Sequence, residues 1–279
     1  MSTATRIEVI ACPTGPPGVR TRLVAGDLSP RRLRSAGAPD STVRVALVAA
    51  RALLLAGDAV RTEVLVEGPV QLDLIETAGT VAYDMRGGSA RWDVSVVLRD
   101  GASLTWAGEP FVVASGASVD RSLSLDLSGG ARAAVRESLV LGRTGEVGGD
   151  LRTRTRASVD DQPLLVEDLD LARDTREGWA VLGAARCLET VTTYGVRLPE
   201  SAGTLQSDRP ASTVRTFGER HHLSRSEQAW ADAVAAMAFG RSTSPTLGGC
   251  ASPSSPTPTH PASGRAAHPP WPLRSKAPT

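Results

Sequence analysis

Carboxylates in apolar surroundings are the side chains of this sequence best placed to do chemistry. Four of them interrupt strongly apolar stretches: Glu76, Asp84, Glu109 and Glu137. A buried and unpaired charge is costly, so each needs either a cationic partner or a polar function. Two interpretations stay open here. Each carboxylate pairs with one of the many arginines, or the four line a polar passage through the fold with oxygen ligands.

The distribution of histidine and lysine argues against several kinds of enzyme. All four histidines fall in the last quarter of the chain, and the only lysine is Lys276. The region before them therefore lacks the commonest general base and metal ligand, and also the lysine of a P-loop or a Schiff base. Cys12, Cys187 and Cys250 are odd in number and far apart, which is typical of reduced cytosolic thiols.

Composition adds further exclusions. With 279 residues, 41% hydrophobic and 22% charged, the chain has the composition of a soluble globular protein. A net charge of +1 offers no field that would attract nucleic acid or an anionic membrane. No stretch resembles a membrane span or a signal peptide. We expect a cytoplasmic protein without a nucleic-acid or membrane partner.

The region from Val43 to Leu171 has the pattern of short β-strands. Apolar residues alternate with polar ones, as in 60–66, 92–98 and 123–127, and turn signals recur at roughly 10-residue spacing. No helical period interrupts this pattern, which disfavours alternating strands and helices. The sequence predicts a mainly β fold, as a sandwich, a barrel or a solenoid-like stack of strands.

The carboxyl-terminal part differs from this. Trp230, Ala233, Val234 and Met237 fall on one face of a predicted helix, which Gly240 would end. Beyond it, Pro, Ser and Thr dominate, with nine of the nineteen prolines after residue 241. We therefore predict a β-rich domain over 1–240 with a small helical portion, and a disordered tail over 241–279.

Two further patterns support weaker alternatives. Arg152, Arg154 and Arg156 project from one face of a predicted strand, where they could bind a polyanion. The glycine-rich run 142–150 lacks the spacing of a nucleotide loop and precedes a strand, so it is predicted to be a hairpin turn. The acidic clusters Asp160-Asp161 and Glu167-Asp168-Asp170 bracket a turn at 162–163, and the pattern favours a solvated hairpin end. Paired carboxylates of this kind could serve a hydrolase only if two faced each other across a cleft.

Four ordered segments resemble the urease accessory protein family UreD, also called UreH. They are Leu53–Asp58 (LLLAGD), Glu76–Tyr83 (ETAGTVAY), Leu104–Phe111 (LTWAGEPF) and Glu137–Glu146 (ESLVLGRTGE). Looser similarity extends from about residue 20 to residue 239. The sequence also departs from the family pattern. Thr77 and Val81 stand where the family has Gln and Lys, and Gly149 stands where a glutamate is expected.

The resemblance implies a β-helix-like stack of strands that acts as a nickel-insertion chaperone without catalytic activity or a tightly bound cofactor. Such proteins bind UreF, which recruits UreG, and the assembly docks on the urease apoprotein. The resemblance also implies that nickel passes through an interior tunnel. A region without histidine suits such a passage, because Ni²⁺ is held more weakly by carboxylate oxygens than by imidazole or thiolate. Glu76, Asp84, Glu109 and Glu137 are then the candidate carboxylates for transient Ni²⁺ contact, in the tunnel or at an interface.

Two other functions stay open at this stage. A carboxylate-based hydrolase on a β-solenoid would need two facing carboxylates in a cleft, and would turn over substrate without partners. A polyanion-binding β-protein would use Arg152, Arg154 and Arg156, and its affinity would fall with salt.

Overall fold

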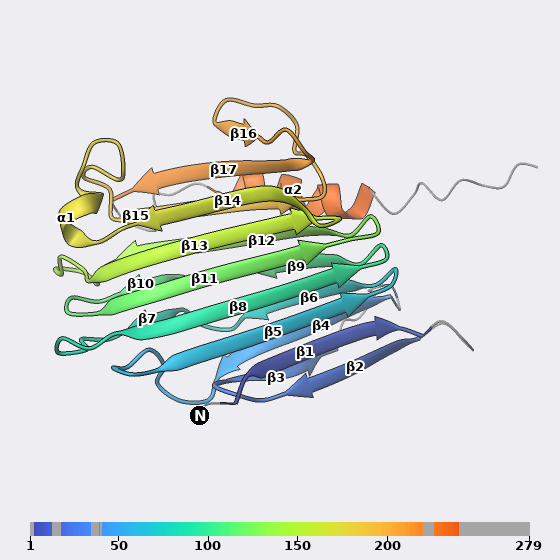
Figure 1. Ribbon diagram of the computed structural model, residues 1–279, viewed down its shortest axis with the longest axis horizontal. Coiled ribbons are helices and arrows are strands. Elements are labelled where there is room, and N and C mark those ends of the chain that lie inside the picture. Colours follow the sequence, from blue (N-terminus) through green and yellow to red (C-terminus); the bar gives the residue numbers. More distant parts are fainter. Residues whose placement is uncertain (1–2, 13–17, 35–38, 40, 220–225, 240–279) are drawn as a thin grey trace, which may run out of the picture. The chain divides into compact units, whose positions relative to one another are not determined.

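The computed structural model describes residues 3–12, 18–34, 39, 41–219 and 226–239 (Figure 1). They all belong to one compact unit, Met1–Ser242. The predicted tail over 241–279 lies outside the described residues, as does Gly240, so these two expectations stay predictions. Among the described helices, none is long and apolar enough to cross a membrane.

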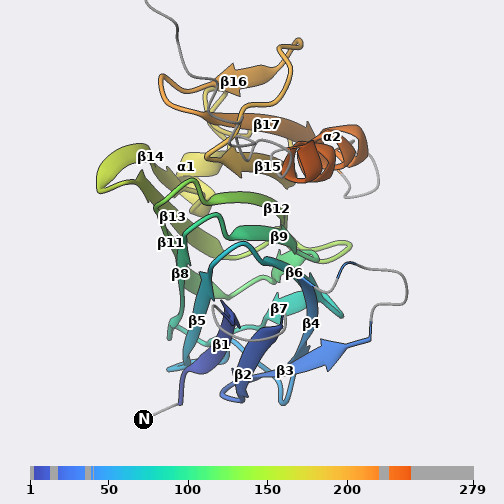
Figure 2. The same cartoon turned by 90° about the vertical axis from the view of Figure 1, so that its right-hand side faces the viewer.

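The strands form two sheets, here called sheet A and sheet B (Figures 1 and 2). Sheet A has the order β14-β13-β11-β8-β5-β1-β2, and the main path of sheet B is β16-β17-β15-β12-β9-β6-β4-β3. The strands of sheet A are β1 (Thr5–Ala11), β2 (Val19–Val24), β5 (Ala59–Glu67), β8 (Ala90–Arg99), β11 (Ser118–Leu127), β13 (Asp150–Val159) and β14 (Gln162–Asp170). The strands of sheet B are β3 (Leu28–Leu33), β4 (Thr42–Ala49), β6 (Gln71–Glu76), β9 (Ser103–Ala107), β12 (Arg132–Leu141), β15 (Cys187–Tyr194), β16 (Thr204–Gln206) and β17 (Ala211–Gly218).

The central part of the chain is a β-solenoid. It passes from sheet A to sheet B and back, and equivalent strands of successive coils pair in parallel. One coil takes about 30 residues, within the usual range for repeat folds. The register in sheet A pairs Ala59 with Arg91, Ala90 with Val119, and Ser118 with Asp150. The fold is therefore mainly β and solenoid-like, which confirms the third of the three predicted architectures.

A third, narrower side closes the coils. In two of them it is a short strand, β7 (Thr80–Ala82) or β10 (Phe111–Val113), and these two pair in parallel. In the next coil the glycine-rich run takes this place, since the N–H groups of Gly142 and Gly149 both donate to the Val113 carbonyl, at 2.8 and 3.2 Å. The hairpin turn predicted for 142–150 is therefore wrong. The run joins β12 to β13, which belong to different sheets.

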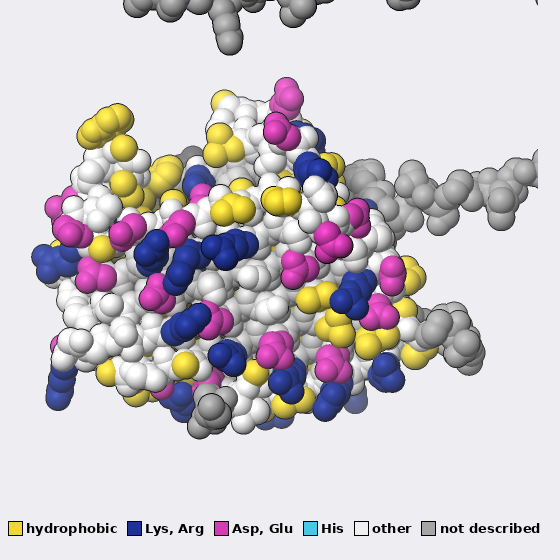
Figure 3. All heavy atoms as spheres, viewed as in Figure 1, with side chains coloured by type: hydrophobic (Ala, Val, Ile, Leu, Met, Phe, Trp, Pro, Cys, Tyr) yellow, Lys and Arg dark blue, Asp and Glu magenta, His cyan; other side chains and the backbone are white. Residues whose placement is uncertain are grey.

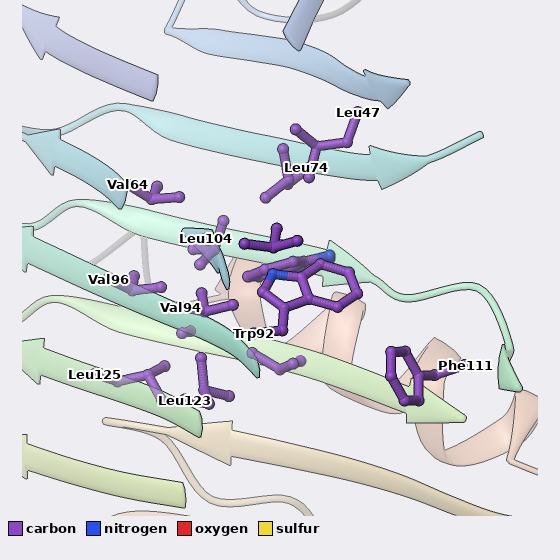
Figure 4. Close-up of a cluster of buried hydrophobic side chains, with 14 of the residues drawn as sticks. Leu47, Val64, Leu74, Trp92, Val94, Val96, Leu104, Phe111, Leu123 and Leu125 are labelled. Carbon is purple, nitrogen blue, oxygen red and sulfur yellow. The ribbon is translucent and has the colours of Figure 1, made fainter. Parts of the chain in front are cut away.

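The apolar core lies between the two sheets, where the strand alternation directs every second side chain (Figure 4). In β5 the buried residues are Val60, Thr62, Val64 and Val66, with the residues between them more exposed. The same alternation holds in β8 and β11, as the sequence predicted. Each large apolar side chain buried in this way stabilises the fold by about 1.5–3 kcal/mol.

Two helices complete the described unit: α1 (Arg173–Arg176) and α2 (Glu227–Phe239). The longer one lies on the outer face of sheet B, where Ala233 and Met237 pack against a small second core. The predicted apolar face of this helix is confirmed at those two positions. Trp230 is half-buried with the Arg136 guanidinium 5.6 Å from its ring centroid, whereas Val234 is exposed.

Strands also occur on both sides of the region that the sequence assigned. β1 pairs in parallel with β5 and extends sheet A, while β15 and β17 extend sheet B by antiparallel pairing. These additions cover the first coil and lengthen the stack beyond the last one.

Candidate functional site

An arginine lies in the layer between the sheets. Alternation along β11 directs Arg121 inward, next to Trp92 of β8 in the sheet A ladder. Its guanidinium carbon lies 5.5 Å from the ring centroid of Trp92 and 5.4 Å from that of Phe111. Its Nη1 is 2.6 Å from Oε1 of Glu137 on β12 of sheet B. The side chains are only 12% and 19% exposed, so this ion pair joins the two sheets from within.

Glu137 has a second carboxylate two strands away. In sheet B, Ile75 pairs with Ala107 and Ala107 with Arg136, so the next residues, Glu76, Gly108 and Glu137, follow in line. Gly108 places no side chain between the two glutamates. A cavity of about 10 Å³ lies there, lined by Glu76, Gly108, Arg121 and Glu137 among others. That is close to the smallest space that holds one water molecule.

Burial alters the acidity of Glu76. Protein atoms closely surround its carboxylate, which accepts hydrogen bonds from Trp106 Nε1 and from the Glu109 backbone N–H, both at 3.1 Å. The pKa of Glu76 is raised, chiefly because burial disfavours the charged form, and the like charge of Glu137 adds to the effect. The Arg121 charge and the two hydrogen bonds act in the opposite direction. Glu76 is therefore a carboxylate that takes up a proton more readily than usual.

A second ion pair joins the sheets farther along the stack. Glu167 of β14 and Arg215 of β17 form a hydrogen-bonded ion pair, and both side chains are about a quarter exposed. Tyr194 is buried on β15. Its pKa is raised, mainly by burial and then by the charges of Glu137 and Glu167. We call these six residues the interior polar track: Glu76, Arg121, Glu137, Tyr194, Arg215 and Glu167.

The four predicted carboxylates are only partly brought together. Glu76 and Glu137 share the cavity, and Glu109, half-buried in the loop after β9, contributes its backbone N–H. Asp84 lies elsewhere, exposed in the turn after β7, where its Oδ1 accepts a hydrogen bond from the Arg86 N–H at 2.8 Å. The expectation that Asp84 has apolar, buried surroundings is therefore wrong. Any nickel contact by these four residues stays a prediction.

The departures from the family pattern have local structural explanations in two cases. The hydroxyl of Thr77 donates to the Leu47 carbonyl at 3.0 Å. At Gly149, a Cβ would lie 2.2 Å from the Ala117 carbonyl oxygen, so the position has no room for a glutamate. Val81 pairs with Val112 in the short ladder of β7 and β10.

The three alternating arginines lie on the outer face of sheet A, as predicted. Arg152 binds Asp168 through two nitrogens, at 2.9 and 2.7 Å, and Arg154 binds Asp120 at 2.8 Å. The pKa of Asp168 is lowered, chiefly by its hydrogen bond with Arg152. Figure 3 shows acidic and basic side chains interspersed across this face. The basic strip around Arg154 and Arg156 is therefore interrupted by carboxylates.

A larger hollow of about 840 Å³ lies beside the glycine-rich run, lined by Arg143, Arg186 and Cys187 among others. Two of its charged side chains, Arg143 and Arg186, are already bonded within the protein. Arg143 pairs with Glu146, whose pKa is lowered to about 2 mainly by that bond, and Arg186 donates to the Leu141 carbonyl at 2.9 Å. The pKa of the Cys187 thiol is raised by burial. No group of three or more metal-ligating side chains occurs among the described residues.

Sequence reasoning missed four members of the track. Arg121 carried a signal, because it interrupts the inward series Val119, Leu123, Leu125 in an otherwise regular strand. Glu167 belonged to an acidic cluster assigned to solvent, although alternation along β14 directs it inward. Tyr194 and Arg215 lie on strands that the sequence analysis did not assign, so no pattern pointed to them.

The comparisons with known proteins agree on one family. The family model described as UreD urease accessory protein matches residues 24–247. A Urease accessory protein UreD 1 of Streptomyces griseus is 49% identical over 176 residues, which cover 62% of this chain and 69% of the relative.

Two further relatives are more distant. A Urease accessory protein UreD 2 of Saccharopolyspora erythraea is 35% identical over 162 residues, covering 56% of this chain and 55% of the relative. A Urease accessory protein UreD of Frankia casuarinae is 32% identical over 209 residues, covering 70% and 63%. The matched stretches thus span between about half and two thirds of the curated relatives.

Proposed function

This chain belongs to the UreD urease accessory protein family, and from that premise we propose that it is a nickel-insertion chaperone for urease. It scaffolds a complex of UreF and UreG on the urease apoprotein and helps to pass Ni²⁺ to the urease active site. It has no catalytic activity of its own, holds Ni²⁺ only transiently, and works in the cytoplasm.

The interior polar track is the observation that supports a passage for the ion. Carboxylate and water oxygens bind Ni²⁺ more weakly than imidazole or thiolate, so the ion can leave again. Glu76 and Glu137 flank a cavity of about 10 Å³, where a cation or a water molecule would meet two carboxylates at once. Arg121 balances the charge of Glu137 while no cation is present.

The track also has a direction. From Glu76 it crosses to Glu137, and in the register of sheet B the row continues through Thr190 to Arg215, which is bonded to Glu167 where both side chains are about a quarter exposed. We propose that Ni²⁺ moves along this line of oxygen atoms when the protein opens in its complex. Asp84 and Glu109 then serve at an interface or at an entrance.

The geometry favours this function over the two alternatives. A hydrolase that used Glu76 and Glu137 would need room for a substrate, and the cavity between them accommodates about one water molecule. A polyanion binder would need a row of free arginines, and two of the three, Arg152 and Arg154, are paired with carboxylates.

The test is co-expression of the tagged chain with UreF, UreG and the urease subunits of one operon. We expect co-purification of UreF with the chain, and of UreG only when UreF is present. Urease from cells without this chain should contain little nickel and show little activity. Failure of UreF to associate, or full urease activation without the chain, would contradict the proposed function.

A further inference from the structure

The two sheets end unevenly at the carboxyl-terminal end of the stack. Sheet A ends at β14, whereas sheet B continues past β15 with β17 and β16. The bond between Glu167 and Arg215 places β14 opposite β17. Among the described strands, none belonging to sheet A lies beyond that point (Figure 2). The inner face of the last part of sheet B therefore lacks a covering strand within the described residues.

Two large apolar side chains lie on this uncovered face. Directly paired residues of antiparallel strands point to the same side of a sheet. Phe217 pairs with Leu188, which belongs to the core between the sheets, so Phe217 also points inward. Leu205 pairs with Thr213, whose hydroxyl meets that of the inward Thr192 at 3.3 Å. Yet Phe217 is 52% exposed and Leu205 is 62% exposed.

The strand that ends sheet A has an open edge beside them. β14 is nine residues long, and β13 is its only hydrogen-bonded neighbour among the described strands. Its other edge presents backbone N–H and C=O groups that a further strand could pair with. A strand added there would continue sheet A over the inner face of sheet B and cover Phe217.

The charges along β14 define the chemistry of such a strand. On the outer face, Asp168 lies opposite Arg154 and Asp170 lies opposite Arg152, both on β13. Asp168 is bonded to Arg152, and Asp170 accepts a hydrogen bond from the Ala172 N–H at 3.0 Å, so a strand at the open edge would share these two carboxylates with their present partners. Opposite charges on adjacent strands stabilise their pairing, and like charges oppose it. A basic strand fits this edge, whereas the β14 of a second copy would bring further carboxylates to it.

We propose that the open edge of β14, together with Phe217 and Leu205, is a docking site for one extended strand of a partner protein. The bound strand has apolar side chains on its inward side and arginine or lysine on its outward side. Its inward residues cover Phe217 and Leu205, and its basic residues meet Asp168 and Asp170. This site is independent of nickel transfer.

The test uses a fluorescent synthetic peptide of alternating valine and arginine, with a peptide of alternating valine and glutamate as the matched control. We expect the arginine peptide to raise fluorescence anisotropy with the full chain and the glutamate peptide to bind at least about tenfold more weakly. Amide exchange of β14 should slow when the arginine peptide is bound. Equal binding of both peptides, no binding of either, or protection confined to another edge would overturn the proposal.

Variants of the apolar face complete the test. Phe217→Asp and Leu205→Asp should each weaken binding of the arginine peptide by about tenfold or more. Leu33→Asp alters a leucine of β3 with 39% exposure at the other end of the stack, and should leave binding unchanged. Equal binding by all three variants would overturn the docking site. The full chain could instead form a dimer that cross-links through β14 and that the arginine peptide does not dissociate. That result would show that a second copy of the chain occupies the edge, and it would overturn the proposal.

Discussion

Two halves of the same interior layer differ in chemistry. In one half, the space between the sheets is filled by aliphatic side chains such as Val64, Leu74 and Leu104 (Figure 4). The other half is the neighbouring inward row that runs across sheet B from Glu76 of β6 through Glu137 and Thr190 to Arg215 of β17, together with the ion-pair partners of Glu137 and Arg215 in sheet A. The strand alternation is the same in both halves.

The difference separates two roles of one architecture. Alternation decides which side chains are inside, whatever their polarity. Aliphatic residues at those positions supply stability, since each buried side chain contributes about 1.5–3 kcal/mol. Charged residues there contribute little or no net stability, because desolvation offsets much of their attraction. The polar half therefore has a composition that stability alone does not explain, as a passage for a cation would require.

Loss of the Arg121 guanidinium should have the largest effect on stability. Arg121→Ala leaves Glu137 without its ion pair and removes the nearest positive charge from Glu76. We expect the free energy of unfolding to fall by about 3–5 kcal/mol. Urea denaturation at pH 7 measures this. If the free energy of unfolding fell no more than it does for a surface substitution, the ion pair of Arg121 and Glu137 would be solvated. The two halves would then not differ in how their side chains are buried.

A cavity in the apolar half should have a similar or slightly smaller effect. Leu104 is fully buried, and Leu104→Ala should lower the free energy of unfolding by about 2–5 kcal/mol. The loss should not depend on pH between 5 and 8, unlike effects in the polar half. Urea denaturation across that range compares the two directly, and a pH-dependent loss at Leu104 would contradict the distinction.

The raised pKa of Glu76 should make the stability of the protein depend on pH, with a smaller effect whose direction follows from the pKa shift. Because its pKa in the folded state exceeds the ordinary value of 4.5, folding favours the protonated form. This contribution to stability is complete below pH 4.5 and is lost as the pH rises through the folded-state pKa. Glu76→Gln should therefore raise the thermal unfolding midpoint at pH 7, and the gain should shrink toward pH 4.5. A lower midpoint at pH 7 would contradict this account.

A substitution on the outer face of sheet A should have the smallest effect on stability. Arg152 and Asp168 are solvent-exposed, and exposed ion pairs of this kind contribute little to stability. Arg152→Ala should leave the thermal unfolding midpoint within experimental error at 0.15 M salt. A clear loss there would mean that the outer pairs matter as much as the inner ones.

The sequence predicted the fold class well because alternation is a local signal. The inward series of β5, β8 and β11 could be read directly, and so could the buried face around Ala233 and Met237. The choice of a solenoid over a sandwich came from the family resemblance. Parallel pairing between coils depends on contacts about 30 residues apart, which no local pattern reveals.

The site was harder to predict for the same reason. Glu76 and Glu137 are 61 positions apart in the sequence, and only the coil register aligns them beside Gly108. Asp84 has apolar neighbours in sequence but lies in an exposed turn. Apolar sequence neighbours thus predicted burial correctly for Glu76 and Glu137 on strands but not for Asp84 in a turn. The partner cation Arg121 comes from the other sheet, so no spacing rule could have paired it with Glu137.

The nickel content of urease matured with Glu76→Gln tests the central claim most directly. This variant should be at least as stable as the original chain at pH 7, so misfolding would not explain a loss of function. The account predicts normal co-purification with UreF, but less nickel per urease and lower activity, whereas Arg152→Ala leaves both unchanged. Normal nickel content with Glu76→Gln would contradict the proposed passage.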